Sequence, residues 1–475
     1  MVSADAPFDV AVIGAGVVGA AIARHLAGYR LRCALLDAAS DVGTGTSKAN
    51  TAILHTGFDA KPGTLEARLV RQGYARLAAY GPSAGIPIER VGALLIAWDA
   101  EQLAALPVIA ENAARNGYAA ARSMTRDELY AVEPQLGPGA LGALSIPDES
   151  LICPFTTPLA FATEAVLNGV HLALDTAVMQ AHTDATGVHA LVTADRSLRA
   201  RHVVNAAGLY ADAIDRCFGH EGFTVTPRRG ELIVFDKLAR PLVNHILLPV
   251  PTARGKGVLV SPTVFGNVVL GPTAEDVADK GATGSTAAGL TSLCENGRRI
   301  LPALLDEEVT AVYVGLRAAT AEADYRIAFH PAQRYVCVGG IRSTGLTASM
   351  AIAEYVVEGL RDAGLELVPK DDVHPVRMPN IGEAYPRPYQ CADVIARDPD
   401  FGRIVCHCER VTRGELLAAV RAPVPARSLD GLRRRTRALL GRCQGFYCSA
   451  AVTRMLAEAS RQSAASLLRL PDGAQ

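Results

Sequence analysis

Four cysteines near the end of the chain have the clearest chemical meaning. Cys406 and Cys408 are separated by one residue, Cys443 and Cys448 by four, and 34 residues lie between the two pairs. Two close pairs of thiolates are the ligand set that a 2Fe-2S cluster requires. Zinc, which favours gaps of two to four residues within both pairs, and disulfides are the alternatives that the spacing leaves open.

A glycine-rich turn near the start of the chain predicts a dinucleotide site. Residues 9–13 read as a buried strand, and the glycines that follow have the spacing GxGxxG: Gly14, Gly16 and Gly19. Glycine permits the tight turn, the approach of a pyrophosphate to the backbone and the packing of the next helix on the strand. A second strand ends at Asp37, 23 residues after Gly14, where a carboxylate can accept hydrogen bonds from a ribose. NAD and FAD both fit this pattern.

Three further segments resemble the D-amino-acid-oxidase-like family of FAD-dependent oxidoreductases, and the likeness covers about residues 8–365. Residues 201–212 are similar to the family's second nucleotide-contact strand, and residues 175–178 to the strand beside the adenine. Residues 338–347, VGGIRSTGLT, are similar to its closing motif, where helix N-terminal amides face the flavin. The resemblance implies FAD contacts at Val178, Gly208, Gly340, Gly345, Leu346 and Thr347.

The stretch from Thr46 to Asp59 resembles the flavin-side loop of glycerol-3-phosphate oxidases and 2-hydroxyglutarate oxidases. Oxidation of an alcohol on flavin needs a base for the hydroxyl proton, and the resemblance implies that His55 is this catalytic base. It also implies that Thr46 and Ser47 contact the flavin or the pyrophosphate. A loop histidine satisfied by backbone groups is the alternative for His55.

Two basic residues are candidates for binding an anionic group on the substrate. Lys256, within residues 251–263, and Arg317, within an apolar run, match positions that line the pocket in the glycerol-3-phosphate oxidase and dehydrogenase group. Arginine suits bidentate recognition of phosphate or carboxylate, whereas lysine acts as a point charge. A solvated surface charge is the alternative for Lys256, and Arg254 and Arg342 are secondary candidates.

The surroundings of the cysteines resemble a domain of the bacterioferritin-associated ferredoxin type, which also ends the large subunit of anaerobic-type glycerol-3-phosphate dehydrogenase. The likeness lies in residues 404–412, 433–437 and 441–448. It implies a 2Fe-2S cluster that passes electrons to a partner protein or a quinone-linked carrier. For the arginine-rich run at 433–437 we expect a solvated helix face, with compensation of an anionic cluster as the alternative.

These residues need a large scaffold to position them. The chain has 475 residues, 49% hydrophobic and 20% charged, which predicts a globular protein of two or three domains. The 47 basic residues balance 48 acidic ones, so nucleic acid is not an expected partner. The apolar stretch 8–27 lacks a preceding basic region, and no run of 18 apolar residues occurs elsewhere. We expect a cytoplasmic protein that meets a membrane only peripherally or through a partner.

The order of the elements predicts an α/β fold, with a Rossmann-like FAD-binding domain, an inserted mixed-sheet substrate domain and a small, mostly helical cysteine-cluster domain. Five prolines in residues 367–390 indicate a linker between an oxidoreductase domain at 1–366 and a 2Fe-2S domain at 391–475. Within the first domain, FAD-binding parts are expected at about 1–80, 150–225 and 315–366, and substrate parts at about 81–149 and 226–314.

Together these features predict an FAD-dependent dehydrogenase that oxidises a small anionic alcohol, with glycerol 3-phosphate or a related polyol phosphate as the expected substrate. A 2-hydroxy acid would suit His55, Lys256 and Arg317 equally well. An amine or amino-acid substrate and a non-catalytic redox relay are further alternatives. The cysteine cluster favours an electron carrier over dioxygen as the acceptor.

Overall fold

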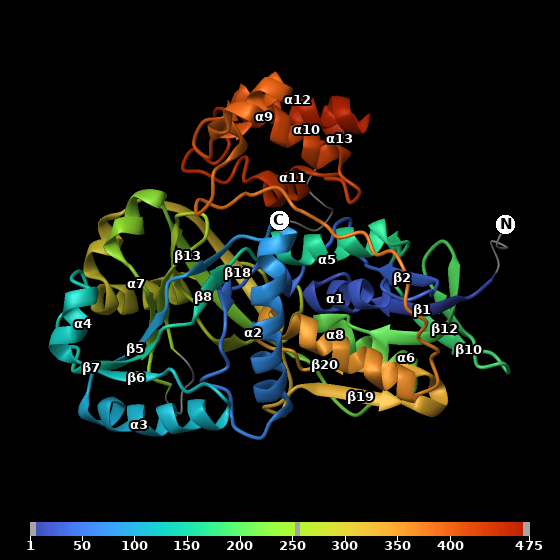
Figure 1. Ribbon diagram of the computed structural model, residues 1–475, viewed down its shortest axis with the longest axis horizontal. Coiled ribbons are helices and arrows are strands. Elements are labelled where there is room, and N and C mark those ends of the chain that lie inside the picture. The colour runs from blue at the N-terminus through green and yellow to red at the C-terminus, as the bar shows by residue number, and fades with distance from the viewer. Residues whose placement is uncertain (1–5, 252–256, 469–475) are drawn as a thin grey trace.

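The structure is a computed structural model that describes residues 6–251 and 257–468 (Figure 1). Two large sheets lie side by side, and the C-terminal residues, orange to red in Figure 1, form a small helical unit above them. The predicted α/β fold class is confirmed. The part with the two large sheets and the small C-terminal unit each have a hydrophobic core of their own.

The first sheet carries the glycine-rich turn. Its strands are β1 (Phe8–Ile13), β2 (Cys33–Leu36), β9 (His171–Ala173), β10 (Gln180–Thr183), β11 (His189–Val192), β12 (Ser197–Asn205), β19 (Arg326–His330) and β20 (Tyr335–Gly339). The strands β9, β2, β1, β12 and β20 are parallel neighbours in that order, and the other three extend the sheet with antiparallel pairings. Parallel sheets are covered on both faces, which explains the apolar sequences of β1 and β2.

Helices cover this sheet on both faces because successive side chains of a strand point in opposite directions. Val10 and Val12 share a hydrophobic core with α1 (Val17–Leu26), whereas Ala11 and Ile13 share one with α6 (Ala211–Cys217). Two more helices, α5 (Thr156–Leu167) and α8 (Gly345–Asp362), pack against α1, and α2 (Leu65–Ala84) packs against α8.

The second sheet is built mainly from the segments 81–149 and 226–314, and their predicted role in substrate binding stays a prediction. Its strands are β5 (Ala93–Ala97), β6 (Arg122–Thr125), β7 (Gly142–Ile146), β13 (Thr226–Phe235), β14 (Ile246–Pro249), β15 (Leu259–Pro262), β16 (Val268–Gly271), β17 (Glu275–Asp276) and β18 (Val309–Ala319). The sheet is mixed, since β14 pairs with β5 in parallel and with β15 in antiparallel orientation. The helices α3 (Ala100–Arg115), α4 (Arg126–Val132) and α7 (Ala287–Ile300) pack against it.

A small third sheet brings distant segments of the chain together. It consists of β3 (Ile53–Leu54), β4 (Ile88–Arg90) and β8 (Ser150–Ile152), and the antiparallel register pairs Leu54 with Ser150. The residue after Leu54 and the residue before Ser150 therefore lie opposite each other.

The C-terminal unit consists of short elements around its own apolar core. They are α9 (Ala392–Arg397), β21 (Ile404–Cys406), β22 (Val411–Thr412), α10 (Arg413–Arg421), α11 (Leu429–Thr436), α12 (Ser449–Ser460) and α13 (Ala464–Leu468). The core includes Val411, Leu416 and Leu432 together with two of the four clustered cysteines, Cys406 and Cys448. The domain boundaries at 367–390 stay a prediction.

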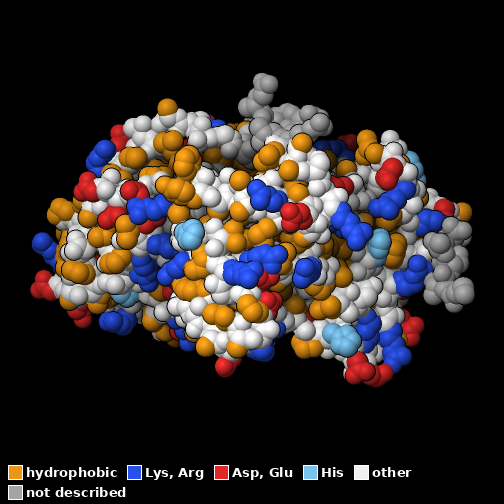
Figure 2. Space-filling model, turned by 90° about the horizontal axis from the view of Figure 1, so that it is seen from above, with side chains coloured by type: hydrophobic (Ala, Val, Ile, Leu, Met, Phe, Trp, Pro, Cys, Tyr) orange, Lys and Arg blue, Asp and Glu red, His pale blue; other side chains and the backbone are white. Residues whose placement is uncertain are grey.

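The surface of the molecule on the side of the C-terminal unit carries scattered basic side chains among hydrophobic ones (Figure 2). No helix in the described ranges has both the length and the hydropathy needed to cross a bilayer.

Candidate active site

A cavity of about 1250 Å³ lies between the first sheet and the second. Its lining residues come from the glycine-rich turn, from residues 44–51 and from β13 and β18. Drug-sized ligands occupy cavities of roughly 300–1000 Å³, so this one has room for a dinucleotide and a small second molecule. Most of the predicted cofactor contacts line it: Gly14, Gly16, Asp37, Thr46, Ser47, Val178, Gly208, Gly340, Gly345 and Leu346.

The glycine-rich turn has no room for larger residues. Gly14 has a φ of +104°, and a Cβ atom there would lie 2.4 Å from the carbonyl oxygen of Ala206. A Cβ on Gly19 would lie 1.8 Å from the carbonyl oxygen of Gly14, so Gly19 serves helix packing behind the cavity. Gly16 lies at the N-cap of α1 and lines the cavity. This backbone cradle at a helix N-terminus fits a pyrophosphate.

Two side chains hold the cradle in place. The carboxylate of Asp37 accepts hydrogen bonds from the amides of Ala15 at 2.6 Å and Ala39 at 2.8 Å, and burial raises its pKa. The hydroxyl of Ser47 accepts a hydrogen bond from the amide of Val17 at 2.9 Å, so it lies at the start of α1. Both side chains therefore lie beside the glycine-rich turn and line the cavity.

His55 follows β3 and lines the same cavity. Its Nδ1 atom lies 3.2 Å from a carboxylate oxygen of Glu149, a residue with no exposed surface. Its backbone amide donates to the hydroxyl of Thr347 at 3.0 Å. Thr347 is buried behind His55 and is absent from the cavity lining, so its predicted role as a flavin contact stays a prediction. Sequence reasoning missed Glu149, because nothing in its local pattern distinguishes it from a surface acid.

Arg317 lies on β18, directly opposite Arg228 of β13, and lines the cavity. Burial, reinforced by the charge of Arg228, lowers the pKa of Arg317 to about 10. Its guanidinium donates to the carbonyl oxygen of Thr273 at 3.2 Å, and within the described ranges no carboxylate forms an ion pair with it. Arg228, in contrast, pairs with Asp276 through two hydrogen bonds of 2.6 and 2.9 Å. Arg317 is therefore a half-buried cation that can receive an anion.

The other predicted cations differ from Arg317. Lys256 and the secondary candidate Arg254 lie outside the described residues. Arg342 lines the cavity but lies 3.5 Å from Glu66 and donates to the carbonyl oxygen of Ala323.

The four clustered cysteines meet in the C-terminal unit, and none of them forms a disulfide. The thiols of Cys408 and Cys443 interact, as do those of Cys406 and Cys448. Hydrogen bonding from the amide of Tyr447, the largest influence, lowers the pKa of Cys443. Two thiol pairs with amide donors suit an iron-sulfur cluster. Among the described residues, no group of three or more His, Cys, Asp or Glu side chains is arranged to hold a single metal ion.

The arginine-rich run does not form a solvated helix face, and that expectation is wrong. Arg434 and Arg435 of α11 are buried, and both donate to the carboxylate of Asp41 at 2.7 Å. Arg437 bonds to Asn267 at 2.9 Å, and its guanidinium lies 4.2 Å from the ring centroid of Phe265. The partners belong to segments far away in the sequence, so the run attaches the C-terminal unit to the rest of the protein.

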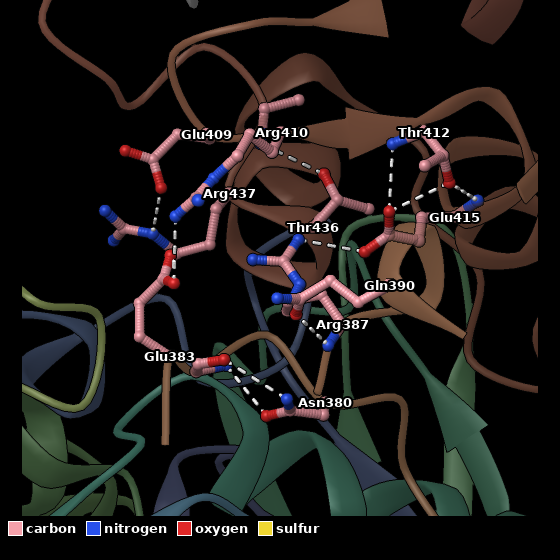
Figure 3. A network of polar contacts seen from close by, with 12 residues as sticks. Asn380, Glu383, Arg387, Gln390, Glu409, Arg410, Thr412, Glu415, Thr436 and Arg437 are labelled. Carbon is pink, nitrogen blue, oxygen red and sulfur yellow. Dashed lines mark hydrogen bonds and ion pairs between the residues drawn. The ribbon is translucent and has the colours of Figure 1, made fainter. Parts of the chain in front are cut away.

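A second set of contacts fixes the segment that precedes the C-terminal unit (Figure 3). Arg387 has 1% of its surface exposed and pairs with Glu415 of α10 at 2.9 Å. Glu383 pairs with Arg410 at 3.0 Å and with Lys237 at 2.6 Å. The proline-rich segment is thus held against both parts of the protein.

Comparisons with known proteins agree with this geometry. The family model described as FAD dependent oxidoreductase matches residues 9–359, and the BFD-like 2Fe-2S binding domain matches residues 404–458. A glycerol 3-phosphate dehydrogenase of Caloramator mitchellensis is 36% identical over 456 residues, which cover 95% of this chain and 94% of the relative.

Two further relatives cover less of the chain. The structure of an L-alpha-glycerophosphate oxidase of Mycoplasma pneumoniae with FAD bound has a TM-score of 0.75 and 28% identity, and its whole length aligns with 79% of this chain. A mitochondrial L-2-hydroxyglutarate dehydrogenase of Arabidopsis thaliana is 27% identical over 73% of this chain and 82% of its own.

Proposed function

Because this chain belongs to the family of FAD-dependent oxidoreductases and ends in a BFD-like 2Fe-2S domain, we propose that it oxidises glycerol 3-phosphate or a related polyol phosphate. FAD and a 2Fe-2S cluster are its cofactors. The names of the dehydrogenase and the oxidase described above support the choice of substrate.

The observation that carries the proposal is that Arg317 lines the cavity and has no carboxylate partner among the described residues. Arg317 is half-buried and no described carboxylate pairs with it, so its charge has lost part of its water without gaining a counter-ion. A phosphate group would supply that counter-ion with bidentate hydrogen bonds. Arg317 and His55 line the same cavity, so one small molecule can reach a cation and a base together.

His55 then provides the base. Its imidazole accepts the proton of the substrate hydroxyl while the hydrogen on the same carbon leaves with its electron pair, and the alcohol becomes a ketone. Bound FAD supplies the acceptor for that hydride. Lys256 is proposed as a second cation for the phosphate.

The C-terminal unit provides an outlet for electrons. Cys406, Cys408, Cys443 and Cys448 would hold the 2Fe-2S cluster, which exchanges one electron at a time. We propose that the acceptor is a partner protein or a quinone-linked carrier.

Anaerobic reduction of the flavin tests the proposal directly. The purified protein is mixed with glycerol 3-phosphate, other polyol phosphates, 2-hydroxy acids and amino acids, and flavin absorbance is followed. Glycerol 3-phosphate should bleach the flavin, and Arg317→Ala should raise its apparent Kd on the order of 100-fold. Arg199→Ala, which removes a half-exposed arginine paired with Asp184, is the matched control. Failure of every polyol phosphate to bleach the flavin would overturn the proposal.

A 2-hydroxy acid is the second candidate, since a guanidinium binds a carboxylate as well as a phosphate. The likeness to L-2-hydroxyglutarate dehydrogenase supports it. Bleaching by 2-hydroxy acids but not by polyol phosphates would identify this function.

A further inference from the structure

The carboxylate beside His55 is buried, and only one of its oxygens forms hydrogen bonds with the described residues. Glu149 has no exposed surface. One oxygen accepts hydrogen bonds from the amide of Thr56 at 2.7 Å and from its hydroxyl at 2.9 Å. The other oxygen lies 3.2 Å from Nδ1 of His55. A buried carboxylate is costly unless its oxygens have donors, and the imidazole of His55 is the group that lies next to the second oxygen.

The turn that carries Glu149 is fixed from several sides. The hydroxyl of Tyr74 donates to the carbonyl oxygen of Asp148 at 2.8 Å, and the amide of Asp148 donates to the hydroxyl of Tyr118 at 3.2 Å. The carbonyl oxygen of Glu149 accepts from the amide of Gly92 at 2.9 Å. These bonds leave the carboxylate little freedom to move away from His55.

The register of β3 and β8 brings His55 and Glu149 together. Leu54 of β3 pairs with Ser150 of β8, so His55 and Glu149 are the next opposed residues along this antiparallel pair. The amide of His55 donates to the hydroxyl of Thr347, which fixes the backbone from the other side. Both partners are therefore held before any substrate binds.

We infer that Glu149 is a positioning residue for His55. It accepts a hydrogen bond from the proton on Nδ1, which leaves Nε2 as the unprotonated nitrogen for the substrate hydroxyl, and it stabilises the imidazolium formed after proton uptake. The inference deepens the proposed function and rests on it for the role of His55 as the base. Glu149 itself does not line the cavity.

Glu149→Gln is the informative variant. With its oxygen still accepting from Thr56, the side-chain amide presents N–H to Nδ1, which favours the tautomer with the proton on Nε2. The rate constant for anaerobic flavin reduction by glycerol 3-phosphate should fall by about 100-fold to 10,000-fold, as expected when a base has the wrong tautomer. The apparent Kd for glycerol 3-phosphate and the FAD content should stay within about twofold of wild type. Glu149→Asp, which keeps the charge, should recover part of the rate.

Glu133 offers a matched control. It is equally buried, lies 2.7 Å from Nδ1 of His245 and accepts hydrogen bonds from two backbone amides, but its partner His245, unlike His55, does not line the cavity. Glu133→Gln should leave the flavin reduction rate unchanged. A purely structural effect of losing a buried carboxylate would lower both rates together.

The tautomer of His55 can be observed without turnover, by nitrogen-15 NMR of the histidine-labelled wild-type protein with His55→Asn for assignment. Protonation on Nδ1 is the expected result. A wild-type proton on Nε2, or a wild-type reduction rate in Glu149→Gln, would overturn the inference. Because this measurement needs no substrate, it distinguishes a failure of the inference from a failure of glycerol 3-phosphate to reduce the flavin.

Discussion

Replacement of Asp41 should weaken the attachment of the C-terminal unit to the rest of the protein. The Asp41 carboxylate accepts three hydrogen bonds of 2.7 Å from two arginines, and the side chains of all three residues are at most 8% exposed. Removal of one partner from a buried ion pair costs about 3–5 kcal/mol. We expect the lower end, about 3 kcal/mol, because Arg434 keeps Asp430 and Arg435 keeps the carbonyl oxygen of Val424.

Native-state hydrogen exchange is the assay. A cost of about 3 kcal/mol corresponds to about a 100-fold larger population of the open state, since each 1.4 kcal/mol is a factor of ten. In Asp41→Ala, peptides that cover α11 should exchange about 100-fold faster than in wild type, while peptides from β1 should not change. Glu308→Ala is the control, because it removes the partner of Arg442 from an exposed part of the same contact. Equal exchange of α11 in Asp41→Ala and wild type would refute the reasoning.

Three further predictions concern pH, flavin and cluster. Burial opposes ionisation of Asp41, but Arg435 and Arg434 outweigh this effect and lower its pKa below the ordinary value of 3.8. The C-terminal unit should therefore stay attached above pH 3.8, and the attachment should weaken as the pH falls below that value. The hydrogen-exchange rate of α11, measured as a function of pH, checks this. Gly19→Ala should purify without FAD because its Cβ would lie 1.8 Å from the carbonyl oxygen of Gly14, whereas Gly28→Ala, with its nearest contact at 3.4 Å, should keep its flavin absorbance. Cys443→Ser should lose the EPR signal of the reduced cluster and keep flavin bleaching by substrate; loss of both together would contradict separate sites.

The sequence predicts those parts of the site that are defined by the spacing of residues close together in the chain. The glycine-rich turn, the strand that ends at Asp37 and the four cysteines all have neighbours within a few residues that define their geometry. Glu149 escapes prediction because its partner is separated from it by more than 90 residues and is reached only through the register of β3 and β8. The burial of Arg434 and Arg435 depends on Asp41, which is 393 and 394 residues away. A local pattern of basic residues contains no information about such a partner.

The attachment of the C-terminal unit also involves the wall of the FAD cavity. Asp41 and Lys48, which lies 3.6 Å from Asp430 of α11, stand on either side of the segment that carries Thr46 and Ser47. Displacement of α11 should therefore loosen residues that line the cavity, and Asp41→Ala should lose FAD more readily on dilution than wild type. Glu308→Ala touches no part of that segment and should retain FAD. If Asp41→Ala exposed α11 but held FAD as tightly as wild type, the two effects would be independent, and the ion pairs would serve attachment alone.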